Sequence, residues 1–248
     1  MFDFSTVKDQ AIAKKVYDEA SEFVAHCHYG SQGVAKTEKD VADAVRYMMS
    51  TGFKPIAFDA EMPFIPMVKD IMQGYTRTHC AVAYPMGRTT LATKLNTLRK
   101  LKEMGVDDVC VCLDWEALFS GNYKAIEEEA SIIMKEFLGH FYRTALILPA
   151  TLMSDTALIE VCKALDQAGV VSIKVNPGAK LGVSFEEVSI IKRNFPNRFD
   201  VHPSGNIRSL SDVLRYREMG CDNIHTVKSL ELVDEYIVKK LKQYGGIN

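Results

Sequence analysis

Lys174 stands inside an apolar run that reads VVSIKVNPGAK at residues 170–180. The run is short and rich in β-branched residues, and Asn-Pro-Gly ends it, so we expect a buried parallel strand that finishes in a tight turn. A lysine there either extends its stem over apolar surface until the amine reaches water, or keeps the amine in a dry pocket. In the second case a neutral amine can add to a carbonyl, and the resulting iminium withdraws electrons from the adjacent carbon–carbon bond. Lys174 is therefore a candidate Schiff-base nucleophile.

A second candidate site is a turn of small and polar residues, HPSGNIRSLSD at residues 202–212. Gly205 would let the backbone approach an anion, and the helix that follows would present N–H groups at its N-terminus. The alternative interpretation is an ordinary turn between a strand and a helix. The same segment begins with His202, and the ordinary pKa of histidine suits proton transfer near neutral pH.

Short apolar runs alternate with longer amphipathic segments along the whole chain. There are eight such runs: FVAHCHY, KPIAFDAE, HCAVAYP, DDVCVCLDW, TALILPAT, VVSIKVNP, RFDVHPSG and DNIHTVKS. Helical patterns lie between them, for example at residues 90–103, 123–138, 155–168, 184–194 and 209–219, and three of these are followed by a glycine placed to end the helix, Gly105, Gly169 or Gly220. The repeat of about 25 to 35 residues is that of βα units.

Eight strands, each followed by a helix, predict a (β/α)8 TIM barrel of the α/β class, with an extra N-terminal helix at residues 8–21. The alternative is an open, doubly wound sheet, but no GxGxxG follows the first strand to mark a dinucleotide site. No linker-like segment interrupts the pattern, so we expect a single domain over residues 1–248.

The composition is that of an ordinary globular protein, with 47% hydrophobic and 25% charged residues. A formal net charge of -2 gives no reason to expect nucleic acid or an anionic membrane as a partner. The start, MFDFSTVKDQ, is unlike a signal peptide, and no apolar stretch approaches the roughly 18 residues of a membrane span, so we expect a cytoplasmic protein. The six cysteines form no CxxC pair, and disulfides are not expected.

The active site of a TIM barrel is built at the carboxyl ends of its strands, and polar residues collect in those parts of the predicted strands. Cys110 and Cys112 flank Val111 and point to one face, and we interpret them as packing residues because no base for a thiol is evident in the sequence. The residues expected to line the pocket are His26, His28, Asp59, Glu61, Cys110, Asn176 and His225.

The sequence resembles the deoxyribose-phosphate aldolase family in four segments: FIP at residues 64–66, GVDDVCVCLDWEALFSGNY at 105–123, SIKVNPG at 172–178 and HPSGNIRSLSD at 202–212. The resemblance implies a barrel enzyme that forms a Schiff base on its strand-six lysine, here Lys174, without an organic cofactor. It also implies a small aldehyde or ketone as substrate, with or without a phosphate group. The residues expected to hold the substrate or its phosphate are Gly178, Ser204, Gly205, Asn206, Arg208 and Lys228.

The chain departs from the family pattern at the positions that handle protons. Cys110 stands at the place of a strand-four aspartate, and His202 at the place of a second lysine on strand seven. Asp114 lies four residues beyond Cys110, an even step that would turn it to the same side of an ideal strand. We therefore expect His202 and Asp114 to move protons for Lys174, and deoxyribose 5-phosphate to be a poor substrate at best.

Two other functions are compatible with the sequence. His26 and His28 form a His-x-His pair on the first predicted strand, as in metal-dependent hydrolases, but strand five adds no histidine and strand eight no aspartate, so we expect no metal. The other is a barrel that has lost catalysis and serves as a binding protein. Neither the substrate nor the oligomeric state follows from the sequence, and a homo-oligomer is compatible with it.

Overall fold

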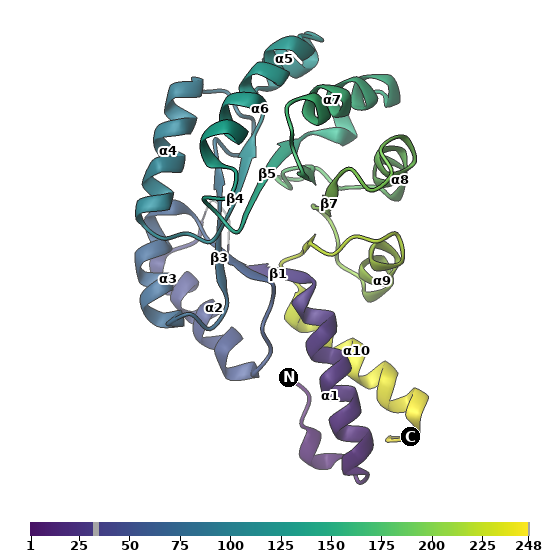
Figure 1. The fold of residues 1–248 in the computed structure, drawn as a ribbon. Helices are drawn as coiled ribbons and strands as arrows, with labels where there is room; N and C mark the ends of the chain where they lie inside the picture. The colour runs from purple at the N-terminus through teal and green to yellow at the C-terminus, as the bar shows by residue number, and fades with distance from the viewer. Residues whose placement is uncertain (32–34, 248) are drawn as a thin grey trace.

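Eight parallel strands form one sheet in the order β7-β6-β5-β4-β3-β2-β1-β8 in the computed structural model, which describes residues 1–31 and 35–247. A parallel bridge between Ser204 and His225 joins the two ends of this sheet and closes it into a barrel (Figure 1). The predicted (β/α)8 barrel is thus confirmed, and each of the eight predicted runs overlaps one strand. The strands are β1 (Cys27–Gly30), β2 (Ala57–Asp59), β3 (Arg77–Val82), β4 (Asp108–Cys112), β5 (Arg143–Leu148), β6 (Ser172–Val175), β7 (Asp200–Pro203) and β8 (Ile224–His225).

Helices surround the barrel, and their ends follow from capping residues in the sequence. Thr37 and Ser184 each form a capping box at the start of a helix, and Gly105 and Gly169 take positive φ angles of 69° and 75° just after two others end. The helices around the barrel are α2 (Glu38–Thr51), α3 (Ile65–Met72), α4 (Leu91–Glu103), α5 (Trp115–Phe119), α6 (Tyr123–Phe137), α7 (Asp155–Gln167), α8 (Phe185–Asn194) and α9 (Leu210–Glu218), with short 3-10 turns η1 (Phe4–Thr6), η2 (Met62–Phe64) and η3 (Ala150–Leu152).

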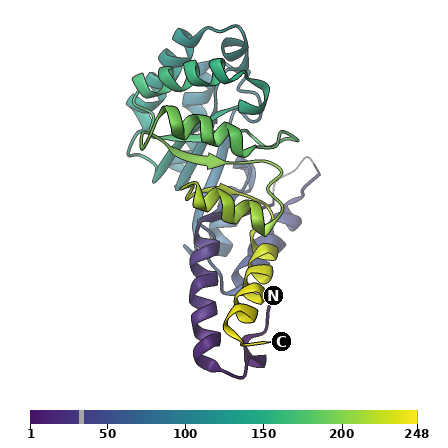
Figure 2. The same ribbon diagram turned by 90° about the vertical axis from the view of Figure 1, so that its right-hand side faces the viewer.

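The first and last helices, α1 (Gln10–Ala25) and α10 (Ser229–Tyr244), lie side by side and extend beyond the barrel (Figures 1 and 2). The ring of Phe23 stacks on that of Tyr236 with centroids 4.7 Å apart, and near the far end of the pair Tyr244 donates a hydrogen bond to Glu19. The helix expected at residues 8–21 is therefore present as α1, and it begins at Gln10, just after Asp9, whose side chain caps its first turn. The chain returns from the start of α1 along the pair, so that the N-terminal amine of Met1 lies beside α10, 3.1 Å from the carboxylate of Asp234.

The apolar core lies between the strands and the surrounding helices. Outward-facing residues such as Val109, Val111, Leu146 and Leu148 are fully buried there. The inside of the barrel differs, because its apolar part is a small cluster on β4 and β5 made of Cys110, Cys112, Ala145 and Ile147. Buried histidine, lysine, aspartate and arginine side chains occupy much of the remaining interior. None of the helices in the described residues is long and apolar enough to cross a membrane.

Candidate active site

The side chain of Lys174 lines a cavity of about 220 Å³ at the carboxyl ends of the strands, although the residue is only 4% exposed. A hollow of about 460 Å³ lies at the opposite end of the barrel, where Ile56, Thr76 and Asp107 immediately precede three strands. TIM-barrel chemistry takes place at the carboxyl ends, so the cavity that holds Lys174 is the candidate active site. Its lining consists of Gly30, Asp59, Tyr84, Lys174 and residues 177–179, 204–208 and 225–227.

The amine of Lys174 is in contact with an imidazole across the barrel. The Nζ atom of Lys174 lies 3.2 Å from Nδ1 of His225, and this Nδ1 in turn lies 3.3 Å from Oδ2 of Asp59. His225 is 7% exposed and Asp59 8%. The three side chains come from β6, β8 and β2, and together they form the polar wall of the cavity.

Asp59 is surrounded by three histidines from neighbouring strands. Its Oδ1 lies 2.7 Å from Nδ1 of His28 and 2.9 Å from Nδ1 of His79, while Oδ2 faces His225. The pairing of β1 with β2 and β8, and of β2 with β3, brings these residues together. Gly30 permits the close approach of β1, because a Cβ there would lie 2.4 Å from the Asp59 carbonyl oxygen. One donor atom from each of the four side chains lies within 4.8 Å of all the others, so these are residues that could hold a metal ion.

Burial and mutual contact set the charges of this cluster. Burial alone would raise the pKa of Asp59, but the charge of His79 and hydrogen bonds from His225 and His28 hold it well below its usual range. Burial lowers the pKa of His28 to about 3 and also holds the pKa of His225 well below its usual range. Burial also acts to lower the pKa of His79, yet the nearby Cys110 and Asp59 outweigh burial and raise this pKa to about 10. The cluster thus holds a carboxylate and two uncharged imidazoles at neutral pH.

His79 was not among the residues expected to line the pocket, and its ring is in contact with Cys110. Its Nε2 lies 2.9 Å from Sγ of Cys110. The sequence does carry a signal for the position of His79. In the third apolar run His79 and Ala81 are two residues apart, so in a strand both face inward while the residues between and after them face outward. Its meaning depends on the pairing of β3 with β4, which places Ala81 opposite Cys110.

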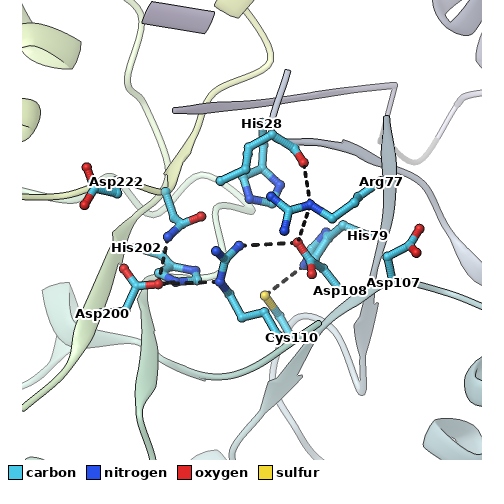
Figure 3. A network of polar contacts seen from close by, with 12 residues as sticks. His28, Arg77, His79, Asp107, Asp108, Cys110, Asp200, His202 and Asp222 are labelled. Atoms are coloured by element: carbon cyan, nitrogen blue, oxygen red, sulfur yellow. Dashed lines mark hydrogen bonds and ion pairs between the residues drawn. The ribbon is translucent and has the colours of Figure 1, made fainter. Parts of the chain in front are cut away.

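A second polar network fills the barrel interior near the amino ends of the strands (Figure 3). Arg143 lies between Asp108 and Asp200, at 3.3 and 3.4 Å. His202 Nε2 lies 2.9 Å from Oδ2 of Asp200, and Asn223 donates to the same oxygen. Burial lowers the pKa of His202, so the uncharged ring donates Nε2–H to the carboxylate. The structure therefore pairs His202 with Asp200, and the imidazole in contact with Lys174 is that of His225.

Asp114 does not lie beside Lys174 as expected. It lies two residues past the end of β4, where its carboxylate accepts the backbone N–H of Glu116 and caps α5. The expectation was wrong because the even step from Cys110 holds only while the chain remains a strand. Asp114 lines a separate hollow between α4 and α6.

His26 also differs from the expectation. It is the residue that ends α1, just before β1, and its ring lies 3.5 Å from the Asp222 carboxylate, so it does not share the inner face with His28. The His-x-His pair is thus not a pair of imidazoles on one strand face. Asn176 binds the backbone and hydroxyl of Thr151 and so ties two loops together. Cys110 packs in the interior, and Glu61 follows β2 immediately before η2.

Five of the six residues expected to hold substrate or phosphate line the cavity, namely Gly178, Ser204, Gly205, Asn206 and Arg208. Gly205 has a φ of 92°, and a Cβ there would lie 2.0 Å from the Leu181 carbonyl oxygen, so the close loop packing requires glycine. The N-terminus of α9 is capped by Ser209, which accepts the N–H of Asp212. The sixth residue, Lys228, pairs on the surface with Glu231 at 2.7 Å.

Comparison with known proteins gives a consistent result. No family profile matches the chain. Deoxyribose-phosphate aldolase of Caldicellulosiruptor saccharolyticus is 28% identical over 156 residues, which cover 62% of this chain and 71% of that protein. Deoxyribose-phosphate aldolase of Caldanaerobacter subterraneus is 24% identical over 176 residues, covering 70% of this chain and 76% of the other.

Solved structures show the same fold. An aldolase named QR15 has a TM-score of 0.80 at 20% identity and covers 89% of this chain and 98% of its own. Deoxyribose phosphate aldolase from Aeropyrum pernix, described as a tetramer, has a TM-score of 0.78 at 20% identity. The match covers 92% of this chain and 98% of the other. The chain is thus similar in sequence to deoxyribose-phosphate aldolases over 62 to 70% of its length and shares their fold, and its strand-six lysine lies at the cavity.

Proposed function

We propose that the protein is a class I aldolase, a carbon–carbon lyase whose nucleophile is Lys174. The observation that carries this proposal is the position of the amine. It is buried in a β-strand, lines the cavity at the carboxyl ends of the barrel, and touches an uncharged imidazole, that of His225. A lysine that merely covered apolar surface would extend its amine to water instead.

The reaction begins when the neutral Lys174 amine adds to the carbonyl carbon of an aldehyde or ketone. Loss of one water gives an iminium. The bond between the α and β carbons of the iminium then breaks as the hydroxyl on the β carbon loses its proton. The electron pair of the broken bond converts the iminium into an enamine, and the β carbon leaves as part of a carbonyl compound. Protonation of the enamine carbon and addition of water release the second product and restore the amine. His225, in contact with the amine, orients it toward the substrate.

The substrate is a small aldehyde or ketone, because the cavity measures only about 220 Å³. Its anionic end, a phosphate in the relatives' named substrate, would lie against the loop at Gly205 and Asn206, with the guanidinium of Arg208 at the same wall. Crystals grown in phosphate or sulfate test this location. An anion bound elsewhere in the barrel would exclude it. The tetrameric Aeropyrum pernix relative motivates a homo-oligomer for this chain, which light scattering after size exclusion tests.

Reductive trapping tests the nucleophile directly. The protein is incubated with each of a panel of small aldehydes and ketones in the presence of borohydride, which reduces a Schiff base to a stable adduct. Peptide mass mapping should locate one such adduct on Lys174, and Lys174→Ala should abolish the labelling. Lys180→Ala is the matched control, because Lys180 lies in the loop that follows β6 and is exposed. Undiminished labelling in Lys174→Ala would refute the assignment.

A further inference from the structure

We propose that His28, Asp59, His79 and His225 form a binding site for one divalent transition-metal ion of the class represented by Zn²⁺ and Co²⁺. The four side chains come from β1, β2, β3 and β8, and all are buried. One donor atom of each lies within 4.8 Å of the other three. This site goes beyond the proposed aldolase function, which needs no metal.

The donor set is the first argument. Three imidazole nitrogens and one carboxylate oxygen are ligands that Zn²⁺ and Co²⁺ accept in proteins. Donors of a tetrahedral zinc site lie about 3.3 Å apart, given bonds of about 2.0 to 2.1 Å. The three nitrogens lie 2.7, 2.9 and 3.3 Å from the oxygens of Asp59. Small side-chain rotations would therefore suffice to bring all four donors onto one ion.

Unsatisfied nitrogens are the second argument. Nδ1 of His79, one of the proposed ligand atoms, is buried and has no hydrogen-bond partner among the residues that the structure describes, and Nε2 of His28 and Nε2 of His225 lack one as well. The rings of His28 and His225 stack with their centroids 3.6 Å apart. Leaving a buried polar atom without a partner costs free energy, and such atoms point to a ligand that the chain itself does not supply.

Access is the third argument. Asp59 and His225 line the cavity beside Lys174, so an ion can enter the cluster from the carboxyl ends of the strands. His225 Nδ1 is also the nitrogen that touches the Lys174 amine. An ion that takes this nitrogen releases the amine from that contact.

The test measures binding of Zn²⁺ and Co²⁺ to the full chain after removal of metal with a chelator. Titration calorimetry with Zn²⁺ should give one site per chain, and Co²⁺ should produce visible absorption bands. Asp59→Asn and His79→Asn should each weaken binding at least about 100-fold, since even partners behind the ligands typically contribute about 10- to 100-fold. Circular dichroism confirms that the variants are folded.

His202→Asn is the matched control, because His202 is an equally buried barrel histidine outside the cluster, and it should bind the ion as the natural chain does. Lys174→Ala should also keep the site, so failed borohydride trapping and failed metal binding are separate outcomes. Absence of binding at micromolar Zn²⁺, or binding unchanged in both Asp59→Asn and His79→Asn, would overturn the proposal. The cluster would then be a carboxylate held by three imidazoles.

Discussion

Nζ of Lys174 and Nδ1 of His225 lie 3.2 Å apart across the barrel, although the two residues are 51 positions apart in the sequence. The contact joins β6 to β8, with β7 between them in the barrel. It gives the amine an imidazole neighbour at the cavity wall. The histidine on the intervening strand, His202, binds Asp200 instead.

His225→Asn should slow formation of the trapped adduct at Lys174 by about 10- to 100-fold, because the amine loses the ring that orients it. His202→Asn should slow it less than threefold, since His202 is held by Asp200. The rate of borohydride-dependent labelling, followed by intact mass, measures both. Equal effects of the two substitutions would contradict the assignment of His225.

Deoxyribose 5-phosphate should be cleaved far more slowly than the median enzyme rate of about 10 per second. Cys110 and His202 stand where the family resemblance places an aspartate and a lysine, and a placed proton-transfer group typically contributes about 10²- to 10⁴-fold. The double variant Cys110→Asp with His202→Lys should recover part of the rate. Steady-state cleavage measures this with Lys174→Ala as blank, and rapid turnover by the natural chain would show that these departures are tolerated.

Removing Asp200 should destabilise the protein in a pH-dependent manner. Burial opposes ionisation of this carboxyl, but the hydrogen bonds from His202 and Asn223 and the charge of Arg143 outweigh it and lower its pKa to about 2. A lowered folded-state pKa stabilises the protein above the unfolded value of about 3.9 and loses this effect as the pH falls toward 2. Asp200→Asn should cost about 1 to 3 kcal/mol at pH 7.

Urea unfolding of both chains from pH 7 to pH 2.5 measures the difference, which should shrink below about pH 4. Asp18→Asn, which removes the exposed partner of Lys14, is the control. A difference that stays constant down to pH 2.5 would show that the charge of Asp200 does not stabilise the fold.

Breaking the buried pair of Lys94 and Glu129 should be more costly than breaking an exposed pair. Lys94 is 1% exposed and donates to the Cys112 carbonyl as well as to Glu129. Glu129→Gln leaves an uncompensated buried charge, which typically costs about 3 to 5 kcal/mol. Asp18→Asn, which breaks the exposed pair with Lys14, should cost less than about 1 kcal/mol. Urea unfolding compares the two, and similar losses would contradict the argument.

The sequence by itself determined the barrel and its nucleophile candidate. Its eight apolar runs, its helical segments and the glycines that end α4 and α7 are local signals, and each was correct because local signals decide where strands and helices begin and end. Lys174 could be singled out for the same reason, since a charged residue in a β-branched run is conspicuous without knowledge of its neighbours.

Only the tertiary structure decided which side chains meet. His28, Asp59, His79 and His225 lie on four strands far apart in the sequence, and their convergence depends on strand pairing and on closure of the barrel through the Ser204–His225 bridge. Asp114 illustrates the converse, because a period-two argument fails once the strand has ended. Side-chain periodicity is a local property of the backbone, whereas a contact across a barrel interior depends on the pairing register of every strand between the two residues.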